Sequence, residues 1–347
     1  MNIDKKENRI IYFDLLNIAA CYGVIWLHCS GDPFTFRLDK YWLTSLFIQV
    51  IAHWAVPMFF MLTGANLINY REKYSTRIYF KRRLLRIFIP FLLWSTIYLV
   101  WKCRLGWIHF SGLRELLGLY LNNGIENIFW FFYPLFAIYL CMPILNIFAD
   151  KKYKTMLLYM TGLGIIAYSF APVISSLSGI PYSGDLNPSV INGYLIYVLL
   201  GWILKNQEFS RKNRCILYAL GVLGAIAMFA GTIVLSIKDG SLNDILWQYM
   251  HFPTLFMTCA IFVFAKYFNW NIFLKSMALK TVITNLSKAS FGVYLIHIML
   301  IDFLTLNQYV NGDSRWWMLL GPVVIYTVTV LIVMLCKKIP GIKYLFP

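Results

Sequence analysis

Residues 215–237 read CILYALGVLGAIAMFAGTIVLSI, an apolar stretch without a single charged side chain. About 20 such residues span the hydrocarbon core of a bilayer as a helix, which satisfies its own backbone hydrogen bonds in the absence of water. Similar stretches recur along the chain, in which 60% of the residues are hydrophobic and 13% are charged. Charged residues make up about 25% of a soluble domain. The sequence therefore predicts an all-α, polytopic membrane protein.

The predicted membrane helices number about ten, at residues 11–30, 46–69, 84–101, 127–148, 155–175, 190–204, 215–237, 252–268, 289–306 and 316–336. Lys5, Lys6 and Arg9 precede the first of them. That helix is too long for the apolar part of a signal peptide and lacks a small-residue cleavage site, so we expect it to remain as an anchor. With no internal repeat or appended soluble domain evident, residues 1–347 are predicted to form a single membrane domain.

The basic residues that give the chain its formal net charge of +16 are distributed unevenly among the loops. If the N-terminus is cytoplasmic, the outer loops contain few of the 31 Lys and Arg residues, namely Arg37, Lys40, Lys102, Arg104, Arg114, Lys238 and Arg315. All the others fall in segments assigned to the cytoplasm, which is the positive-inside pattern. It predicts that both termini are cytoplasmic, and it explains the charge through the lipid bilayer, without a nucleic-acid partner.

The first helix carries three strongly polar residues in the segment YFDLLNIAACYGVIWLH, residues 12–28. Such residues cost about 2.5–3.5 kcal/mol each in a membrane helix on insertion scales, and they mark functional sites by default. At 100° per residue, His28 lies within about 20° of Asn17 and about 16 Å further along the axis, and Asp14 lies one turn before Asn17. This shared face indicates acid–base chemistry. Hydrogen bonds between helices are the alternative interpretation.

Metal and thiol chemistry receive no support from the residue spacing. The histidines show no i,i+3 or i,i+4 pair of the kind that forms a helical ligand set: His28, His53, His109, His251 and His297. The seven cysteines contain no CxxC pair, and most lie in apolar segments. We therefore predict no metal site and no cysteine nucleophile.

Five segments resemble motifs of the integral membrane acyltransferase 3 family, the surface polysaccharide O-acyltransferases. The segment FDLLNIAACYGVIWLH (13–28) is similar to the family's opening motif of Asp, two or three residues, Arg, ten residues and His. The others follow in the family's order, as VPMFFMLTG (56–64), FKRRLLRIFIP (80–90), WFFYPLFAIYLCMPIL (130–145) and SFGVYLIHIML (290–300). Asn17 departs from the pattern, because most members carry Arg there. Asn occurs at the corresponding place in the distantly related lysosomal heparan acetyltransferases.

The resemblance implies an enzyme that moves an acyl group, usually acetyl, from cytoplasmic acyl-CoA to a hydroxyl of a cell-surface glycan or its lipid-linked precursor. Acyl-CoA, acetyl-CoA in most members, is then the donor substrate, and no permanently bound cofactor is expected. The implied partners are acyl-CoA, the carbohydrate acceptor and the bilayer. The expected location is a bacterial plasma membrane, crossed several times.

Histidine suits the general base that a hydroxyl needs when it attacks a thioester. Burial disfavours a charged imidazole, so we expect His28 to be neutral and able to accept the proton. Asn17 or Asp14 would orient a partner or the pantetheine arm. His297, in the motif YLIH, is the alternative base, unless it only forms an interhelical hydrogen bond.

The remaining predicted contacts are with the two substrates. Arg82, Arg83 and Arg86 enter the third helix from the cytoplasm and suit the phosphates of CoA, because guanidinium groups bind phosphates bidentately. Ordinary positive-inside anchoring is the alternative. The resemblance also implies substrate contacts from Trp130, Tyr133 and Tyr294.

Two other classes of protein are compatible with about ten membrane helices that contain polar residues. A transporter of a small polar solute such as an amino acid predicts repeat symmetry and Gly or Pro interruptions at matched positions, and neither is evident. A scaffold in an export complex would leave His28 without a role.

Overall fold

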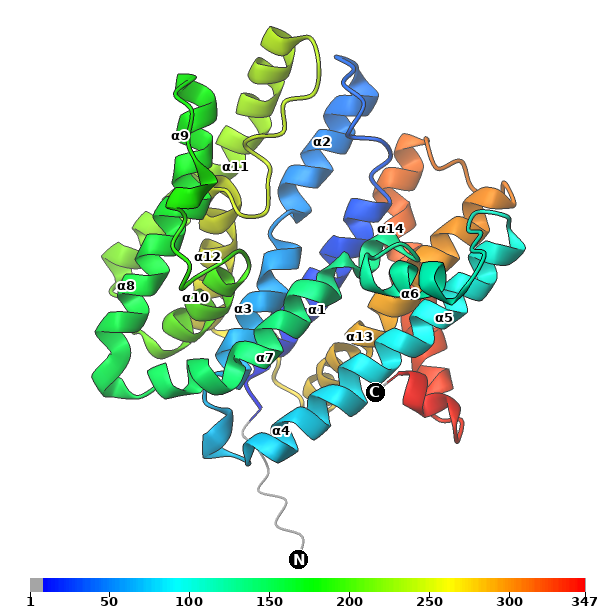
Figure 1. Ribbon diagram of the computed structural model, residues 1–347, viewed down its shortest axis with the longest axis horizontal. Coiled ribbons are helices and arrows are strands. Elements are labelled where there is room, and N and C mark those ends of the chain that lie inside the picture. The colour runs from blue at the N-terminus through cyan, green and yellow to red at the C-terminus, as the bar shows by residue number, and fades with distance from the viewer. Residues whose placement is uncertain (1–8, 347) are drawn as a thin grey trace, which may run out of the picture.

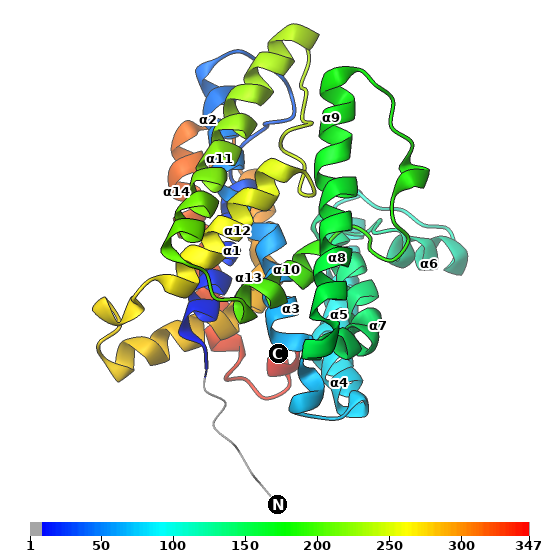
Figure 2. The same ribbon diagram turned by 90° about the vertical axis from the view of Figure 1, so that its left-hand side faces the viewer.

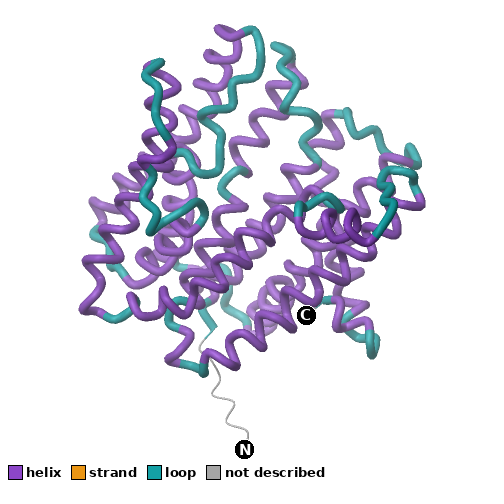
Figure 3. Tube along the Cα trace, viewed as in Figure 1, coloured by secondary structure: helices purple, strands orange, loops and turns teal. Residues whose placement is uncertain are grey.

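The computed structural model describes residues 9–346, of which no part forms a β-strand (Figure 3). The chain is 75% helical, which confirms the predicted all-α class. Lys5 and Lys6, which contribute to the predicted charge pattern, lie outside the described residues.

Eight helical stretches are long and apolar enough to cross a membrane: Ile11–His28, Lys40–Glu72, Thr76–Arg104, Asn127–Phe148, Lys154–Ser178, Arg211–Asp239, Met277–Leu306 and Arg315–Cys336. Two shorter apolar helices, Leu195–Asn206 and Phe252–Tyr267, lie between them in the chain. Each of these segments overlaps one of the ten predicted ranges. The chain is therefore a multi-pass membrane protein, and the side of the membrane on which its termini lie stays a prediction.

The α-helices, labelled in Figures 1 and 2, are α1 (Ile11–His28), α2 (Lys40–Ala52), α3 (Ala55–Leu67), α4 (Thr76–Arg83), α5 (Ile89–Arg104), α6 (Leu113–Leu121), α7 (Phe132–Phe148), α8 (Lys154–Gly164), α9 (Ala171–Ser178), α10 (Leu195–Asn206), α11 (Arg211–Asp239), α12 (Phe252–Tyr267), α13 (Met277–Leu306) and α14 (Arg315–Cys336). The start of α1 and helix α4 lie at one end of the bundle, and the start of α2 and the end of α9 lie at the other. We call the first the basic end, because Arg82, Arg83 and Arg86 lie there.

Two of the spans contain a π-helical turn, and one is interrupted. The turn Leu84–Phe88 joins α4 to α5, and the turn Ile165–Phe170 joins α8 to α9. The predicted helix 46–69 is divided at His53 and Trp54 into α2 and α3. These irregularities matter because π-turns and interrupted membrane helices often occur at functional sites.

Local sequence explains where several helices begin and end. The Asp39 carboxylate accepts a hydrogen bond of 2.8 Å from the backbone N–H of Trp42 and caps α2. Serine hydroxyls cap α4, α11 and α13 in the same way, at Ser75, Ser210 and Ser276. Gly240, with a φ of 66°, ends α11 in the left-handed conformation that glycine adopts without strain.

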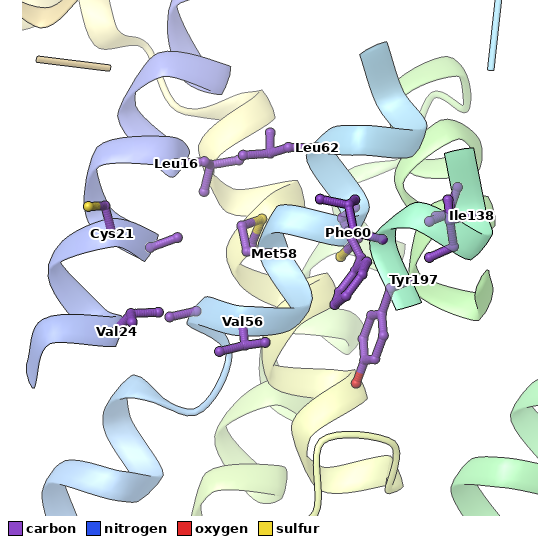
Figure 4. Packing of buried hydrophobic residues seen from close by; sticks show 14 of the residues in the cluster. Leu16, Cys21, Val24, Val56, Met58, Phe60, Leu62, Ile138 and Tyr197 are labelled. Carbon is purple, nitrogen blue, oxygen red and sulfur yellow. The ribbon is translucent and has the colours of Figure 1, made fainter. Parts of the chain in front are cut away.

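Helix α3 lies at the centre of the bundle, between α1 and α10. Figure 4 shows Leu16 and Val24 of α1 beside Leu62 and Val56 of α3. Phe60 points to the opposite side of α3, toward α10. Packing on both faces fixes α3 relative to α1, whose polar residues form part of the candidate site.

Two glycines allow α3 and α10 to come into backbone contact. A Cβ atom added to Gly64 would lie 1.8 Å from the carbonyl oxygen of Val198, and one added to Gly201 would lie 1.9 Å from that of Met61. Small residues at helix interfaces permit such close approach in membranes, where van der Waals packing drives association.

Helices α10 and α12 are too short to cross a bilayer alone, since they have 12 and 16 residues and spanning takes about 20. The chain before each of them, residues 179–194 and 241–251, has no α-helix. Irregular backbone at membrane depth is tolerated where protein or a cavity surrounds it. These segments bring Tyr194 and Tyr249 into the bundle.

Candidate active site

A cavity of about 440 Å³ lies among α1, α2, α3, α13 and the segment 127–131. We call it the histidine cavity, because His28 is part of its wall. Its polar lining consists of Asn17, His28, Gln49, Asn127, Tyr249, Ser287, Ser290 and Tyr294. The structure therefore brings together four predicted site residues: Asn17, His28, Trp130 and Tyr294.

His28 is the last residue of α1, and its side chain is accessible from the histidine cavity. Its ring centroid lies 5.2 Å from that of His297. Within residues 9–346, no hydrogen bond engages either ring nitrogen of His28. An acceptor nitrogen is thus available to a molecule in the cavity.

His297 is fully buried behind His28, on α13, and does not line the cavity. Its Nδ1 lies 2.7 Å from the carbonyl oxygen of Tyr294. A carbonyl oxygen only accepts, so we assign the proton of the neutral ring to Nδ1 and the lone pair to Nε2. Nε2 is buried and has no hydrogen-bond partner among the described residues. His297 is therefore not accessible from the cavity, whereas His28 is.

Asn17 lines the histidine cavity and two further cavities. Its amide nitrogen donates to the backbone oxygen of Ser287 at 2.9 Å and to the Ser287 hydroxyl at 3.1 Å. The carbonyl partner fixes the orientation of the carboxamide, which leaves Oδ1 as a free acceptor. Asn17 is therefore an anchored polar group at the point where the cavities meet.

A second cavity, of about 430 Å³, is lined by Arg82, Arg83 and Arg86 at the basic end of the bundle. We call it the arginine cavity. It shares with the histidine cavity the side chains of Asn17, Phe59, Phe131 and Phe291. These four residues, which we call the collar, lie between the two neighbouring cavities.

Aromatic rings hold two of the arginines in place. The Arg82 guanidinium lies 4.4 Å from the centre of the Tyr74 ring, and that of Arg83 lies 5.5 Å from the Tyr139 ring. The Arg83 Nε is buried without a hydrogen-bond partner in the described part of the chain. Arg83 is the last residue of α4, and Arg86 lies in the π-turn that follows. The turn places both guanidinium groups in the wall of the arginine cavity.

Asp14 does not share a cavity with His28. Its carboxylate forms a bidentate ion pair with Arg9, with distances of 2.6 and 2.7 Å, and it lines a third cavity, of about 470 Å³. Asp14 and His28 are 14 positions apart, which corresponds to about 21 Å of helix. The face predicted from the sequence is thus divided at Asn17, and the structure gives Asp14 no contact with the histidine pair.

The three predicted aromatic contacts lie in different places. Trp130 lines the histidine cavity and stacks on Tyr249, with ring centroids 5.8 Å apart. Tyr294 also lines it, and its hydroxyl donates to the backbone oxygen of Ile128. Tyr133 is absent from the cavity lining. Its hydroxyl donates to the backbone oxygen of Tyr120 at 2.5 Å, so it holds that segment instead.

Sequence reasoning missed five polar residues of the lining, namely Gln49, Asn127, Tyr249, Ser287 and Ser290. Gln49 donates to the Ser30 hydroxyl at 2.9 Å, and its place inside a predicted span was a signal, since carboxamides are rare there. Ser287 anchors Asn17 but resembles any interfacial serine. Tyr249 follows a predicted outer loop, and nothing in the sequence indicates that the chain enters the bundle there.

No group of three or more His, Cys, Asp or Glu side chains among residues 9–346 is arranged to hold a metal ion. The polar groups that line the two cavities include imidazole, carboxamide, hydroxyl and guanidinium groups. The chain is thus a multi-pass membrane protein in which a histidine-lined cavity lies next to an arginine-lined cavity.

The family model for the acyltransferase domain matches residues 10–337, nearly the whole chain. The chain belongs to the acyltransferase 3 family, and it is a membrane acyltransferase. No curated protein and no solved structure gives a significant match.

Proposed function

We propose that the protein transfers an acyl group, acetyl as in most relatives, from cytoplasmic acyl-CoA to a hydroxyl of a cell-surface glycan or its lipid-linked precursor. The observation that carries the proposal is the collar, across which the arginine cavity adjoins the histidine cavity. The proposed location is a bacterial plasma membrane, with the basic end in the cytoplasm.

The chemistry of acyl-CoA matches the residues that line this pair of cavities. Its diphosphate would lie against Arg83 and Arg86, where guanidinium groups form charge-assisted hydrogen bonds. The narrow pantetheine arm would pass the collar, where Asn17 Oδ1 can accept a hydrogen bond from a pantetheine amide. The thioester would then reach the histidine cavity.

The acceptor would enter the same cavity from its other end, near Phe34 in the segment between α1 and α2. The acceptor oxygen attacks the thioester carbonyl carbon while His28 removes the hydroxyl proton. The tetrahedral intermediate then breaks its carbon–sulfur bond, and the proton on His28 passes to the departing CoA sulfur. The products are the acyl ester and free CoA, and His28 is neutral again.

His297 supports this cycle as a positioning residue. An N–H of His28 can turn toward the Nε2 of His297, which has no other partner. That hydrogen bond would leave the second nitrogen of His28 unprotonated and directed to the cavity. Catalytic histidines commonly have a hydrogen-bond partner that fixes the tautomer of the imidazole.

The lining supports a polar, ring-shaped acceptor. Trp130 and Tyr249 present aromatic surface, and Gln49 and Asn127 add hydrogen-bonding groups. Such a surface can contact both the apolar face and the hydroxyls of a sugar.

The test is calorimetric binding of acetyl-CoA to the purified protein in nanodiscs, followed by transfer of radiolabelled acetyl to a glycan extract. Saturable binding and a labelled, base-labile carbohydrate ester are expected. A protein that does not bind acyl-CoA but exchanges a polar solute across liposomes would overturn the proposal in favour of transport.

A further inference from the structure

Helices α11 and α12 form an apolar groove of about 290 Å³ that takes no part in the proposed reaction. Its α11 wall extends from Tyr218 to Ala225 and its α12 wall from Met257 to Phe264. Each wall consists of four residues at positions i, i+3, i+4 and i+7, which form one face of a helix. The groove shares no residue with the histidine cavity or the arginine cavity. It is therefore a separate feature of the bundle.

Small residues bring the two helices into contact along the groove. A Cβ atom added to Gly221 would lie 2.5 Å from the Cβ of Ala260. The larger side chains of Val222 and Phe264 also line the groove and are exposed. Because α11 is one of the membrane spans, hydrocarbon surrounds these side chains. The groove is thus open to the acyl chains of the bilayer.

A cationic side chain lies just beyond one end of the groove. The rings of Tyr218 and Phe264 pack edge to face across the two helices, with centroids 6.2 Å apart. Arg214 lies four residues before Tyr218, and Tyr267 lies three residues after Phe264, so both continue the faces that form the groove. The Arg214 guanidinium lies 4.3 Å from the centre of the Tyr267 ring, which holds it at this end.

The hydrogen-bond donors of the Arg214 guanidinium have no partner within residues 9–346, and its Nε is buried. The Glu208 carboxylate, which also lies beside Tyr267, is engaged elsewhere. It pairs with the Lys266 ammonium at 3.2 Å and accepts a hydrogen bond of 2.7 Å from the Tyr267 hydroxyl. A guanidinium with unused donors suits the oxygens of a phosphate.

The length of α11 places Arg214 at the membrane surface. The helix has 29 residues, and Arg214 lies in its first turn, whereas about 20 residues cross the hydrocarbon. From Arg214 to Ala225 the helix rises about 16 Å, about half of the roughly 30 Å hydrocarbon core and hence the depth of one leaflet. Exposed Arg211 and Lys212 in the same turn add positive charge.

We propose that the groove binds an anionic phospholipid, with the phosphate at Arg214 and one acyl chain between α11 and α12. The positive charge of this turn favours a headgroup of net negative charge over a zwitterionic one. A lipid bound in this way contacts both helices, so it stabilises their packing in the folded protein.

The experiment measures the dissociation constant of the first bound lipid by native mass spectrometry of the full-length protein in detergent. Phosphatidylglycerol and phosphatidylcholine with the same acyl chains are the probes. The wild-type protein should bind phosphatidylglycerol about fivefold more tightly, the factor expected for one arginine near an anionic headgroup. Arg214→Gln should remove this preference, and Arg214→Lys should keep part of it. Lys212→Gln is the matched control, because Lys212 is exposed on another face of the same turn.

Val222→Trp tests the part of the site that holds the acyl chain. Val222 is exposed and lines the groove, so a larger ring there fills the space from the outside. Both lipids should bind more weakly, by the same factor. Ile226→Trp is the control, since Ile226 is exposed one turn further along α11 and does not line the groove. Melting temperatures measured without added lipid verify that the variants are folded.

Equal affinities of the wild-type protein for the two lipids would overturn the proposal. An equal loss of preference in Arg214→Gln and Lys212→Gln would also overturn it, because it would indicate general surface attraction. Displacement of phosphatidylglycerol by glycerol 3-phosphate would identify a site for a soluble anion and contradict a lipid site. These outcomes do not depend on acyl transfer, so they leave the proposed function untouched.

Discussion

The imidazole rings of His28 and His297 lie 5.2 Å apart at an angle of 49°. One ring faces the histidine cavity, and the other is fully buried. Only His28 is accessible from the cavity, so the two histidines have different surroundings. The sequence left open which of them is the base, and this relationship supports His28.

His28→Gln should lower the rate of acyl transfer by about 10²–10⁴-fold, because a general base typically contributes that factor. The affinity for acyl-CoA should stay close to wild type, since His28 lies beyond the collar from the arginine cavity. Single-turnover transfer and calorimetry measure the two effects separately. Near-normal transfer by His28→Gln, together with its loss in His297→Gln, would mean that His297 is the base.

His297→Leu should lower kcat and leave the KM for acyl-CoA unchanged, because it removes the acceptor next to His28 but no substrate contact. His297→Gln retains a hydrogen-bonding group at this position, so it should recover part of the lost rate. Steady-state kinetics of both variants provide the comparison. A purely structural histidine would instead give two variants with equal activity and equally reduced thermal stability.

Arg83→Gln and Arg86→Gln should each weaken acyl-CoA binding by at least about tenfold, since hydrogen bonds to charged groups contribute about 1.5–3 kcal/mol. Calorimetric titration measures the change. Arg77→Gln is the control, because Arg77 lies on the same helix, is exposed and does not line the cavity. A similar loss of affinity in all three variants would indicate general surface attraction instead of a site.

Reporter fusions at Asp185 and Lys212 should lie on opposite sides of the membrane. The positive-inside pattern assigns Asp185 to an outer loop and Lys212 to the cytoplasm, and α10 lies between them. An enzymatic reporter active only in the periplasm and one fluorescent only in the cytoplasm distinguish the sides. Both fusions on the same side would mean that α10 and its preceding segment do not complete a crossing.

The sequence was sufficient for the architecture because each span is specified locally. An apolar run such as 215–237 must become a helix in lipid whatever it packs against. Asn17 and His28 were identifiable for a related reason, since polar groups are costly in a spanning helix and stand out. These inferences need no knowledge of neighbouring helices.

The parts that the sequence did not predict depend on tertiary contacts. Asp14 was grouped with His28 by helical spacing, but Arg9 holds its carboxylate in another cavity. Tyr133 carries the expected aromatic ring, yet its hydroxyl is engaged by Tyr120. Side-chain partners of this kind cannot be read from spacing along one helix.

Gly64→Ala should destabilise the protein by more than the about 1–3 kcal/mol typical of an overpacked core. The new methyl group would lie 1.8 Å from a backbone oxygen of α10, and backbone cannot move aside as a flexible side chain does. Helices α3 and α10 would have to separate, which would also displace Phe59 of the collar. Thermal unfolding of the purified protein measures the loss.

Gly162→Ala is the matched control, since it lies in α8 and a Cβ there meets no heavy atom within 4 Å. Alanine favours a helix over glycine by about 0.5–1 kcal/mol, so this variant should be as stable as wild type or slightly more so. Comparable melting temperatures for Gly64→Ala and Gly162→Ala would show that α3 and α10 are not in backbone contact. The close packing that positions the collar would then be wrong.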